Sequence, residues 1–374
     1  MIDLRFKADF SWNGPPVVLT LASADTDRDQ PEGYAAQIEP MLAGGILCRS
    51  EFGSFSFTPE QSDSFDGDIV LCIPQKGRVE RLFRANSQYN SLTLTERCDQ
   101  YCLMCSQPPR DIDDSWRFPH YAEAIRRLPE GAWIVLSGGE PTLFGEALLV
   151  LLEDIASTRN DLNIHILSNG QHFQDFDMDR LAAVHSRLNV LWGIPLYAPS
   201  APLHDQIVDK EGAFTRLLEN LYPLAASGAV IELRTVVTAL NVLEMPALAR
   251  FISTHIPFIS YWAIMAMEPV GFAKANLKQL WFDHSLAPFP IHATLDLTRH
   301  LGVKTRLYNF PLCTLGERYW QFCEQSISDW KRKYLDDCSN CDEKGACTGF
   351  FEWYTGGWEG VSPIARPVQT SEAV

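Results

Sequence analysis

The chain has 374 residues, of which 46% are hydrophobic, and a formal net charge of −16. Its length allows two or three domains with packed cores. No apolar run reaches the roughly 18 residues needed to cross a bilayer, and the acidic excess argues against nucleic-acid phosphates as the main partner. Ten cysteines without a secretory signal indicate a reducing compartment, where clustered thiols tend to bind metal. We therefore expect a cytoplasmic protein with neither a membrane span nor a nucleic-acid partner.

Residues 1–85 are predicted to form a β-rich N-terminal module. Alternating apolar and polar residues over Ile2–Lys7 have the period of a half-buried strand. Two further strands, Asp68–Ile73 and Arg78–Phe83, flank a short turn and predict a hairpin. Such a module could bind a peptide leader as an added strand at an exposed sheet edge. We interpret it as a candidate peptide-recognition module.

Three cysteines follow the predicted strand Ser91–Thr95. Cys98, Cys102 and Cys105 have the spacing CxxxCxxC. Three thiolates this close can hold three irons of a cubane cluster and leave the fourth iron without a protein ligand, whereas electron-transfer clusters use four cysteines. An open coordination position is typical of catalytic metal centres. The alternatives are a zinc knuckle or three unrelated core cysteines.

A second motif ends the next predicted strand, Trp133–Ser137. The apolar run is followed at once by Gly138-Gly139-Glu140-Pro141, which indicates a buried parallel strand that stops abruptly. Paired glycines allow a backbone to approach a ligand closely. The motif therefore marks a candidate ligand-binding turn.

Residues 86–302 are predicted to form one domain, in which strands and helices alternate from about Asn90 to Pro269, whereas residues from about Gly271 to Gly302 have a less clear period. This alternation indicates βαβ units and a parallel sheet, in which ligands bind at the carboxyl ends of the strands. Both motifs fall at such ends. The six units are fewer than the eight of a closed barrel. Besides the two strands above, we expect strands at Asn163–Ser168, Leu188–Ile194, Val230–Val237 and Ile259–Met265, and helices at Tyr121–Leu128, Gly145–Ser157, Asp177–His185, Ala213–Ser227 and Glu244–His255.

Residues 303–361 hold a second group of cysteines. Cys338 and Cys341 form a CxxC pair, and Cys347 follows after five residues. Either Cys313 or Cys323 can supply a fourth thiolate, and we favour Cys313 because it follows a turn-like segment after a probable strand. Four thiolates suit zinc or an iron–sulfur cluster, and spacing does not decide between them. Residues 362–374 are predicted to be a disordered tail.

The CxxxCxxC and Gly-Gly-Glu-Pro motifs together resemble the signature of radical SAM enzymes. The resemblance implies a 4Fe–4S cluster on Cys98, Cys102 and Cys105, with S-adenosylmethionine (SAM) at its open iron. It also implies that Gly138, Gly139 and Glu140 help to hold SAM. The expected fold class is α/β: a partial (β/α)6 TIM-like barrel with the β-rich N-terminal module and a C-terminal cysteine-rich cluster extension.

A longer string, Met104-Cys105-Ser106-Gln107-Pro108-Pro109, resembles the C-type radical SAM maturases of His-Xaa-Ser peptide systems. Asp68–Leu71, Thr95–Cys98 and Cys347–Phe351 are similar to that group as well. The resemblance implies a ribosomally made precursor peptide as substrate, a second radical SAM maturase as partner and a reducing electron donor. Many peptide-modifying members carry auxiliary clusters, and this implies an auxiliary 4Fe–4S cluster at the second cysteine group: Cys313, Cys338, Cys341 and Cys347.

Three further SAM contacts are assigned by position alone. Ser168 and Asn169 end the third strand of the sheet, and the Arg234 guanidinium on the fifth suits a carboxylate. A plain turn residue and a structural salt bridge are the respective alternatives for Asn169 and Arg234. No catalytic side chain is assigned. The competing functions are a radical SAM lyase or ring-modifying enzyme acting on a small molecule, and a non-catalytic iron–sulfur or zinc protein.

Overall fold

The computed structural model describes residues 4–23, 35–41, 44–59 and 64–365. The chain divides into two compact units, each described by itself below. The first unit comprises Met1–Asp99, Pro109–Trp192 and Asn220–Ala229, and the second comprises Gln100–Pro108, Gly193–Glu219 and Val230–Val374.

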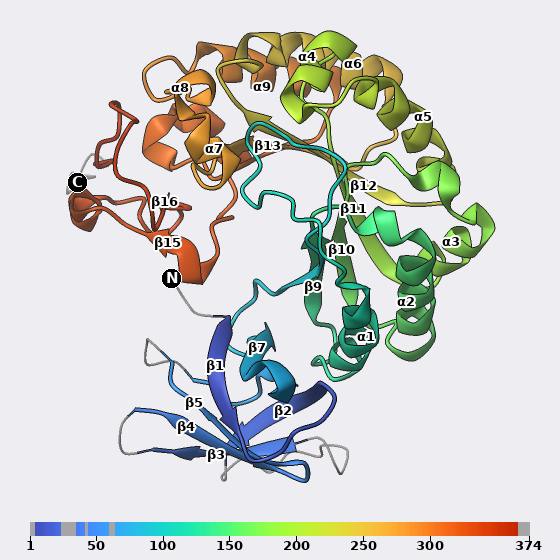
Figure 1. The fold of residues 1–374 in the computed structure, drawn as a ribbon. Helices are drawn as coiled ribbons and strands as arrows, with labels where there is room; N and C mark the ends of the chain where they lie inside the picture. Colours follow the sequence, from blue (N-terminus) through green and yellow to red (C-terminus); the bar gives the residue numbers. More distant parts are fainter. Residues whose placement is uncertain (1–3, 24–34, 42–43, 60–63, 366–374) are drawn as a thin grey trace, which may run out of the picture. The chain divides into compact units, whose positions relative to one another are not determined.

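The N-terminal strands of the first unit close into a barrel (blue in Figure 1). The order is β1-β5-β4-β3-β2-β6-β7, and β7 pairs back onto β1. The predicted hairpin is confirmed as the antiparallel pair β6–β7, with Gly77 in the left-handed region at φ 53° between them. The first predicted strand begins later than expected, and Met1–Asp3 lie outside the described residues. The strands are β1 (Arg5–Phe10), β2 (Val17–Ser23), β3 (Ala35–Pro40), β4 (Ile46–Ser50), β5 (Gly53–Phe57), β6 (Ile69–Ile73) and β7 (Arg78–Phe83).

Closure of the barrel determines whether the module has a free strand edge for an added peptide strand. Each of the seven described strands pairs with a neighbour on both sides, and a closed barrel has no free edge. The described strands therefore leave no open edge to which a leader peptide could add as a further strand, the binding mode that the sequence suggests. The interior is filled by aromatic side chains, including Phe6, Phe55 and Phe57, with the two buried cysteines Cys48 and Cys72.

A parallel sheet follows the barrel in the chain. Its order is β14-β13-β12-β11-β10-β9-β8, one strand more than the six predicted. The pairs β8–β9 and β9–β10 of the first unit and β12–β13 and β13–β14 of the second are all parallel. The additional strand β14 lies in the region assigned to the cysteine-rich extension. The strands are β8 (Ser91–Thr95), β9 (Trp133–Gly138), β10 (Asn163–Leu167), β11 (Asn189–Pro195), β12 (Val230–Val237), β13 (Tyr261–Ala266) and β14 (Thr305–Tyr308).

Helices connect the strands, as the alternation predicted. Five of them match predicted segments, and four more, α4 and α7–α9, lie outside the predicted segments. In α2, six apolar side chains are buried along one side of the helix, the pattern of a helix packed on a core. The helices are α1 (Phe118–Arg126), α2 (Gly145–Thr158), α3 (Met178–His185), α4 (Ala201–Val208), α5 (Ala213–Ala226), α6 (Met245–His255), α7 (Phe272–Ala275), α8 (Leu277–Leu280) and α9 (Phe289–Leu301).

The C-terminal residues have little regular structure. Two short strands, β15 (Arg332–Lys333) and β16 (Phe350–Phe351), pair antiparallel. The first residues of the predicted disordered tail are packed against the chain instead: Ile364 accepts a backbone hydrogen bond from Asp342 and donates one to the sulfur of Cys341. Residues 366–374 of that tail lie outside the described residues. In the described part of the chain, no helix has both the length and the apolar character needed to span a membrane.

Candidate functional site

The glycine motif at the end of β9 packs directly on the chain that leads into Cys98. Gly139 N–H donates to the Thr95 carbonyl at 2.7 Å, and Glu140 N–H donates to the Arg97 carbonyl at 2.7 Å. A Cβ on Gly138 would collide with the Thr95 carbonyl, and one on Gly139 with the Arg97 carbonyl. Both positions therefore require glycine because two backbones meet there, and the first of the two also has φ 138°.

Glu140 joins the ends of two neighbouring strands. Its side chain is fully buried. One carboxylate oxygen accepts from the Thr142 N–H at 2.9 Å and the Ser168 hydroxyl at 2.9 Å, and the other accepts from the Asn169 N–H. Burial raises the pKa of Glu140, and these hydrogen bonds partly counteract the effect. The structure thus brings together three predicted SAM contacts, with the Glu140 carboxylate occupied by the protein's own donors.

Asp99, inside the first cysteine motif, connects that loop to the end of β10. Its carboxylate accepts from the Asn169 side-chain amide at 2.7 Å and lies 3.1 Å from Nε2 of His172. Sequence reasoning missed both Asp99 and His172. The available signals were the place of Asp99 between two of the cysteines and that of His172 just after the Ser168-Asn169-Gly170 strand end.

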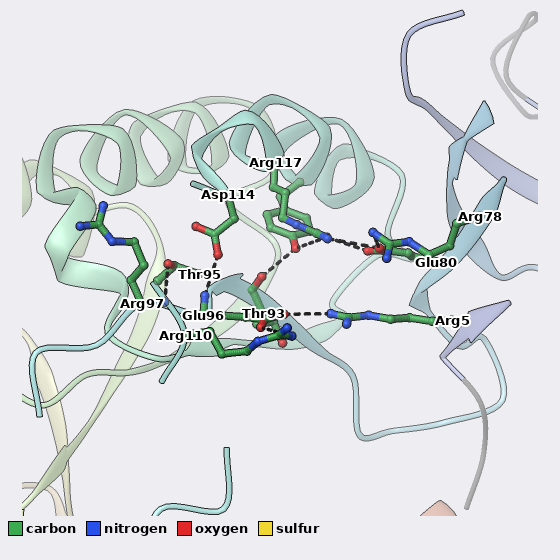
Figure 2. A network of polar contacts seen from close by, with 11 residues as sticks. Arg5, Arg78, Glu80, Thr93, Thr95, Glu96, Arg97, Arg110, Asp114 and Arg117 are labelled. Carbon is green, nitrogen blue, oxygen red and sulfur yellow. Dashed lines mark hydrogen bonds and ion pairs between the residues drawn. The ribbon is translucent and has the colours of Figure 1, made fainter. Parts of the chain in front are cut away.

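Charged side chains surround the loop between β8 and Cys98 (Figure 2). Asp114 accepts from the Glu96 N–H at 2.6 Å, and the Glu96 carboxylate pairs with Arg5 at 3.4 Å and Arg110 at 3.1 Å. Arg5 lies on barrel strand β1, so the pair connects the barrel with the loop that precedes Cys98.

A second connection runs through Arg117. Its guanidinium binds both carboxylate oxygens of Glu80 on β7, at 2.6 and 3.2 Å. It also donates to the Tyr121 hydroxyl, which in turn donates to the Thr93 carbonyl of β8 at 2.7 Å. Burial raises the pKa of Glu80, but Arg117 and its neighbours outweigh burial and hold that pKa below its usual range.

Cys102 and Cys105 belong to the second unit, whereas Cys98 belongs to the first. The Cys105 N–H donates to the Cys102 carbonyl at 2.9 Å, and the Phe272 N–H donates to the Cys105 carbonyl at 2.8 Å. Burial raises the pKa of the Cys105 thiol. Met104 between them packs in an apolar cluster with Ile207, Met267, Ala273 and Leu280.

Arg234 on β12 is paired with a neighbour on its own strand. The guanidinium binds the buried Glu232 carboxylate at 2.7 Å and approaches the Met265 sulfur at 3.3 Å. Burial lowers the pKa of Arg234, but Glu232 outweighs burial and keeps that pKa above its ordinary value. Since residues i and i+2 of a strand share a face, the pair is a local salt bridge.

The second cysteine group lines one pocket of about 380 Å³, its mouth included. Cys313, Cys338, Cys341 and Cys347 are all on its wall, and Cys323 is not among the lining residues. Three backbone N–H groups point at the sulfurs: those of Leu312 and Gly349 at Cys347, and that of Ile364 at Cys341, each at 3.4 Å. Burial raises the pKa of Cys313 to about 11.

The donor chemistry of this pocket fits an iron–sulfur cluster. Four thiols match the ligand number of a cubane, and hydrogen bonds to sulfur are one of the means by which proteins tune such clusters. Within residues 4–23, 35–41, 44–59 and 64–365, no three His, Cys, Asp or Glu side chains are grouped as ligands of a single metal ion.

No family model and no curated protein sequence matches this chain. Among solved structures, Streptococcus suis SuiB bound to S-adenosylmethionine is 14% identical, with a TM-score of 0.47, over 58% of this chain and 49% of that one. A radical SAM methyltransferase from Sphaerobacter thermophilus is 13% identical, with a TM-score of 0.41, over 72% and 75%. The anSMEcpe structure with AdoMet and a Cp18Cys peptide is 14% identical, with a TM-score of 0.39, over 58% and 62%. The match spans about half the length of SuiB, and any assignment of function rests on the residues of this chain.

Proposed function

We propose that this chain is a radical SAM enzyme that modifies a ribosomally made peptide. One observation carries the proposal: the Gly-Gly-Glu turn is hydrogen-bonded to Thr95 and Arg97, immediately before Cys98. The turn and the start of the cysteine motif therefore form one local structure, at the carboxyl ends of parallel strands, where α/β sheets bind ligands.

Cys98, Cys102 and Cys105 would hold the first cluster through thiolates. When bound, the cluster and SAM supply a 5′-deoxyadenosyl radical by one-electron cleavage of the sulfonium, chemistry that belongs to the cofactor. The protein positions the loop that carries the cysteines and the strand ends beside it. Glu140 ties the ends of β9 and β10 together, and Asp99 ties the loop to Asn169.

The second cysteine group would hold the auxiliary cluster. Its four thiols share a pocket, and Cys313 rather than Cys323 lies on the wall. In that pocket the raised pKa of Cys313 means that cluster loading releases a proton from this thiol. This set of residues supports a tetrathiolate site.

A peptide substrate is the finer part of the proposal. It rests on the Met104–Pro109 string and on the other segments that resemble His-Xaa-Ser maturases, with a second radical SAM maturase and a reducing electron donor as partners in the cytoplasm. The closed N-terminal barrel would have to recognise a leader with its outer surface or loops, since its described strands have no free edge.

The test is to incubate the reduced, cluster-loaded enzyme with SAM and a precursor peptide that contains His-Xaa-Ser triplets and is encoded by a gene next to the one for this chain. We expect 5′-deoxyadenosine and a loss of about two mass units per modification, because one hydrogen atom would end in 5′-deoxyadenosine and the second would leave as a proton, with its electron returned to the redox partner that started the SAM cleavage. Formation of 5′-deoxyadenosine with an unchanged peptide and turnover of a small metabolite would support the lyase alternative. Absence of 5′-deoxyadenosine under all conditions would contradict radical SAM chemistry itself.

A further inference from the structure

The loop that carries Cys102 and Cys105, residues 100–108, is contacted within the second unit by two other segments. One is the end of helix α4, and the other is the segment 271–280, which contains α7 and α8. Neither segment includes a residue that the sequence assigns to the cluster or to SAM. The loop therefore has protein contacts of its own, which do not depend on a cluster.

Hydrogen bonds hold the backbone of this loop at alternate residues. The Tyr101 N–H donates to the Val208 carbonyl at 3.2 Å, and the Leu103 N–H donates to the Ile207 carbonyl at 2.9 Å. The side-chain amide of Asn276 donates through Nδ2 to the Leu103 carbonyl at 2.9 Å. Both backbone groups of Leu103, which lies between the two cysteines, are thus bound by other parts of the chain.

Gly271 brings a second backbone against the loop. The Phe272 N–H donates to the Cys105 carbonyl at 2.8 Å. A Cβ on Gly271 would stand 2.6 Å from the carbonyl oxygens of both Cys105 and Ser106, which is too close for any side chain. Gly271 also has φ 57° and ψ −130°, a conformation that only glycine adopts readily. The close approach and the backbone angles therefore both require glycine here.

Apolar packing adds a third contact between the loop and the same segment. The buried Met104 side chain packs in a cluster that includes Ala273 and Leu280 of the segment and Ile207 of α4. A backbone hydrogen bond, a side-chain hydrogen bond and an apolar contact thus come from ten consecutive residues. Supporting contacts of this kind keep a site in one geometry, and a site without them is too loose.

From these contacts we infer that the segment 271–276 positions the first cysteine loop, with Gly271 and Asn276 as the positioning residues. The inference rests on the proposed function in taking Cys102 and Cys105 as cluster ligands. The segment shapes the loop before a cluster is loaded. Because SAM binds the open iron in the proposed function, a displacement of the thiols displaces its binding site as well.

The first measurement uses the full chain without iron and records backbone hydrogen exchange by mass spectrometry. We expect the peptide that covers residues 100–108 to be protected in the wild type and to exchange at least about tenfold faster in Gly271→Ala, because the added Cβ forces the two backbones apart. Gly302→Ala is the matched control. Gly302 has φ 72°, but its Cβ would meet nothing within 4 Å, so the loop should exchange as in the wild type.

The second measurement uses the anaerobically loaded enzyme and a readout other than turnover. The electron paramagnetic resonance spectrum of the reduced cluster is recorded as SAM is added, because coordination of the open iron changes that spectrum. In Asn276→Ala we expect the SAM concentration at half-change to rise at least about tenfold at unchanged iron content. Asn276→Asp keeps the shape but loses the N–H donor, so it should behave in the same way. Gly302→Ala should match the wild type.

An unprotected loop in the iron-free wild type, or equal exchange in Gly271→Ala and Gly302→Ala, would overturn the inference. An unchanged SAM titration in both Asn276 variants would overturn it as well. Asn276→Asp covers the case of an alanine variant that fails to fold. A wild type whose loaded cluster shows no spectral change with SAM would instead contradict the proposed function, so the two failures are distinguishable.

Discussion

The two cysteine groups are positioned in different ways. The chain that leads into the first group is held by hydrogen bonds: the Gly139 and Glu140 N–H groups at the end of β9 donate to the Thr95 and Arg97 carbonyls, and the Asp114 carboxylate accepts from the Glu96 N–H. The second group combines Cys313 with the later segment Cys338–Cys347, and its four thiols share one pocket. The first arrangement depends on a mesh of hydrogen bonds, the second on packing around the sulfurs. Substitutions at the two groups should therefore have different effects on iron content, SAM cleavage and stability.

The largest effect is expected from removing the first group. The triple variant Cys98→Ala, Cys102→Ala, Cys105→Ala should form no 5′-deoxyadenosine and keep about four of about eight irons after anaerobic reconstitution. Iron analysis and chromatography of the nucleoside measure both quantities. Continued nucleoside formation in this variant would show that the first motif does not carry the chemistry.

Removing the second group should separate iron content from SAM cleavage. Cys338→Ala with Cys341→Ala should lose about four irons and retain uncoupled 5′-deoxyadenosine formation, because the first group is intact. Cys323→Ala is the matched control, since its thiol does not line the pocket, and it should keep the full iron content. Tightly bound zinc in the wild type, with about four irons per chain, would instead make the second site a structural zinc centre.

The hydrogen-bond mesh is tested at Glu140. Glu140→Ala leaves buried donors on Thr142, Ser168 and Asn169 without an acceptor, and each such loss costs about 1 to 3 kcal/mol. We expect the free energy of unfolding to fall by at least about 3 kcal/mol in denaturant titrations. Glu146→Ala is the control. Its side chain is 72% exposed and pairs only at the surface, so a change below about 1 kcal/mol is expected. Equal losses in the two variants would contradict the role of Glu140.

The smallest effects concern the links between the barrel and the loop (Figure 2). Arg117→Ala removes a bidentate, mostly buried contact with Glu80 and should cost about 2 kcal/mol in unfolding free energy. Arg5→Ala removes a pair in which the arginine is 49% exposed, and should change the unfolding free energy by less than about 0.5 kcal/mol. The order of the two losses is the measured quantity, and a reversed order would mean that the Arg5–Glu96 pair is the stronger link.

Part of this picture could be read from the sequence because it depends on local patterns. The apolar runs of β9, β12 and β13, the β6–β7 hairpin and the breaks after β8 and β9 are produced by side-chain periodicity and glycine turns. Cysteines three and four residues apart lie on one loop whatever the rest of the chain does. The expected loops and strand ends are therefore found where the residues predicted them.

Other features depend on contacts between distant residues. The alternation of apolar and polar residues predicts single strands, but it cannot show that the N-terminal strands form a closed barrel, because closure depends on the pairing of β1 with β7. A strand is expected before the turn-like segment that precedes Cys313, but its four residues carry too little pattern to show that it joins the parallel sheet as β14, which depends on its pairing with β13. Glu232 lies two residues before Arg234 in the sequence, so for this pair only the burial depends on tertiary packing. The Ser168 and Asn169 donors of Glu140, and the pocket that Cys313 shares with the later cysteines, exist only after folding, because their side chains come from segments that the sequence does not place together.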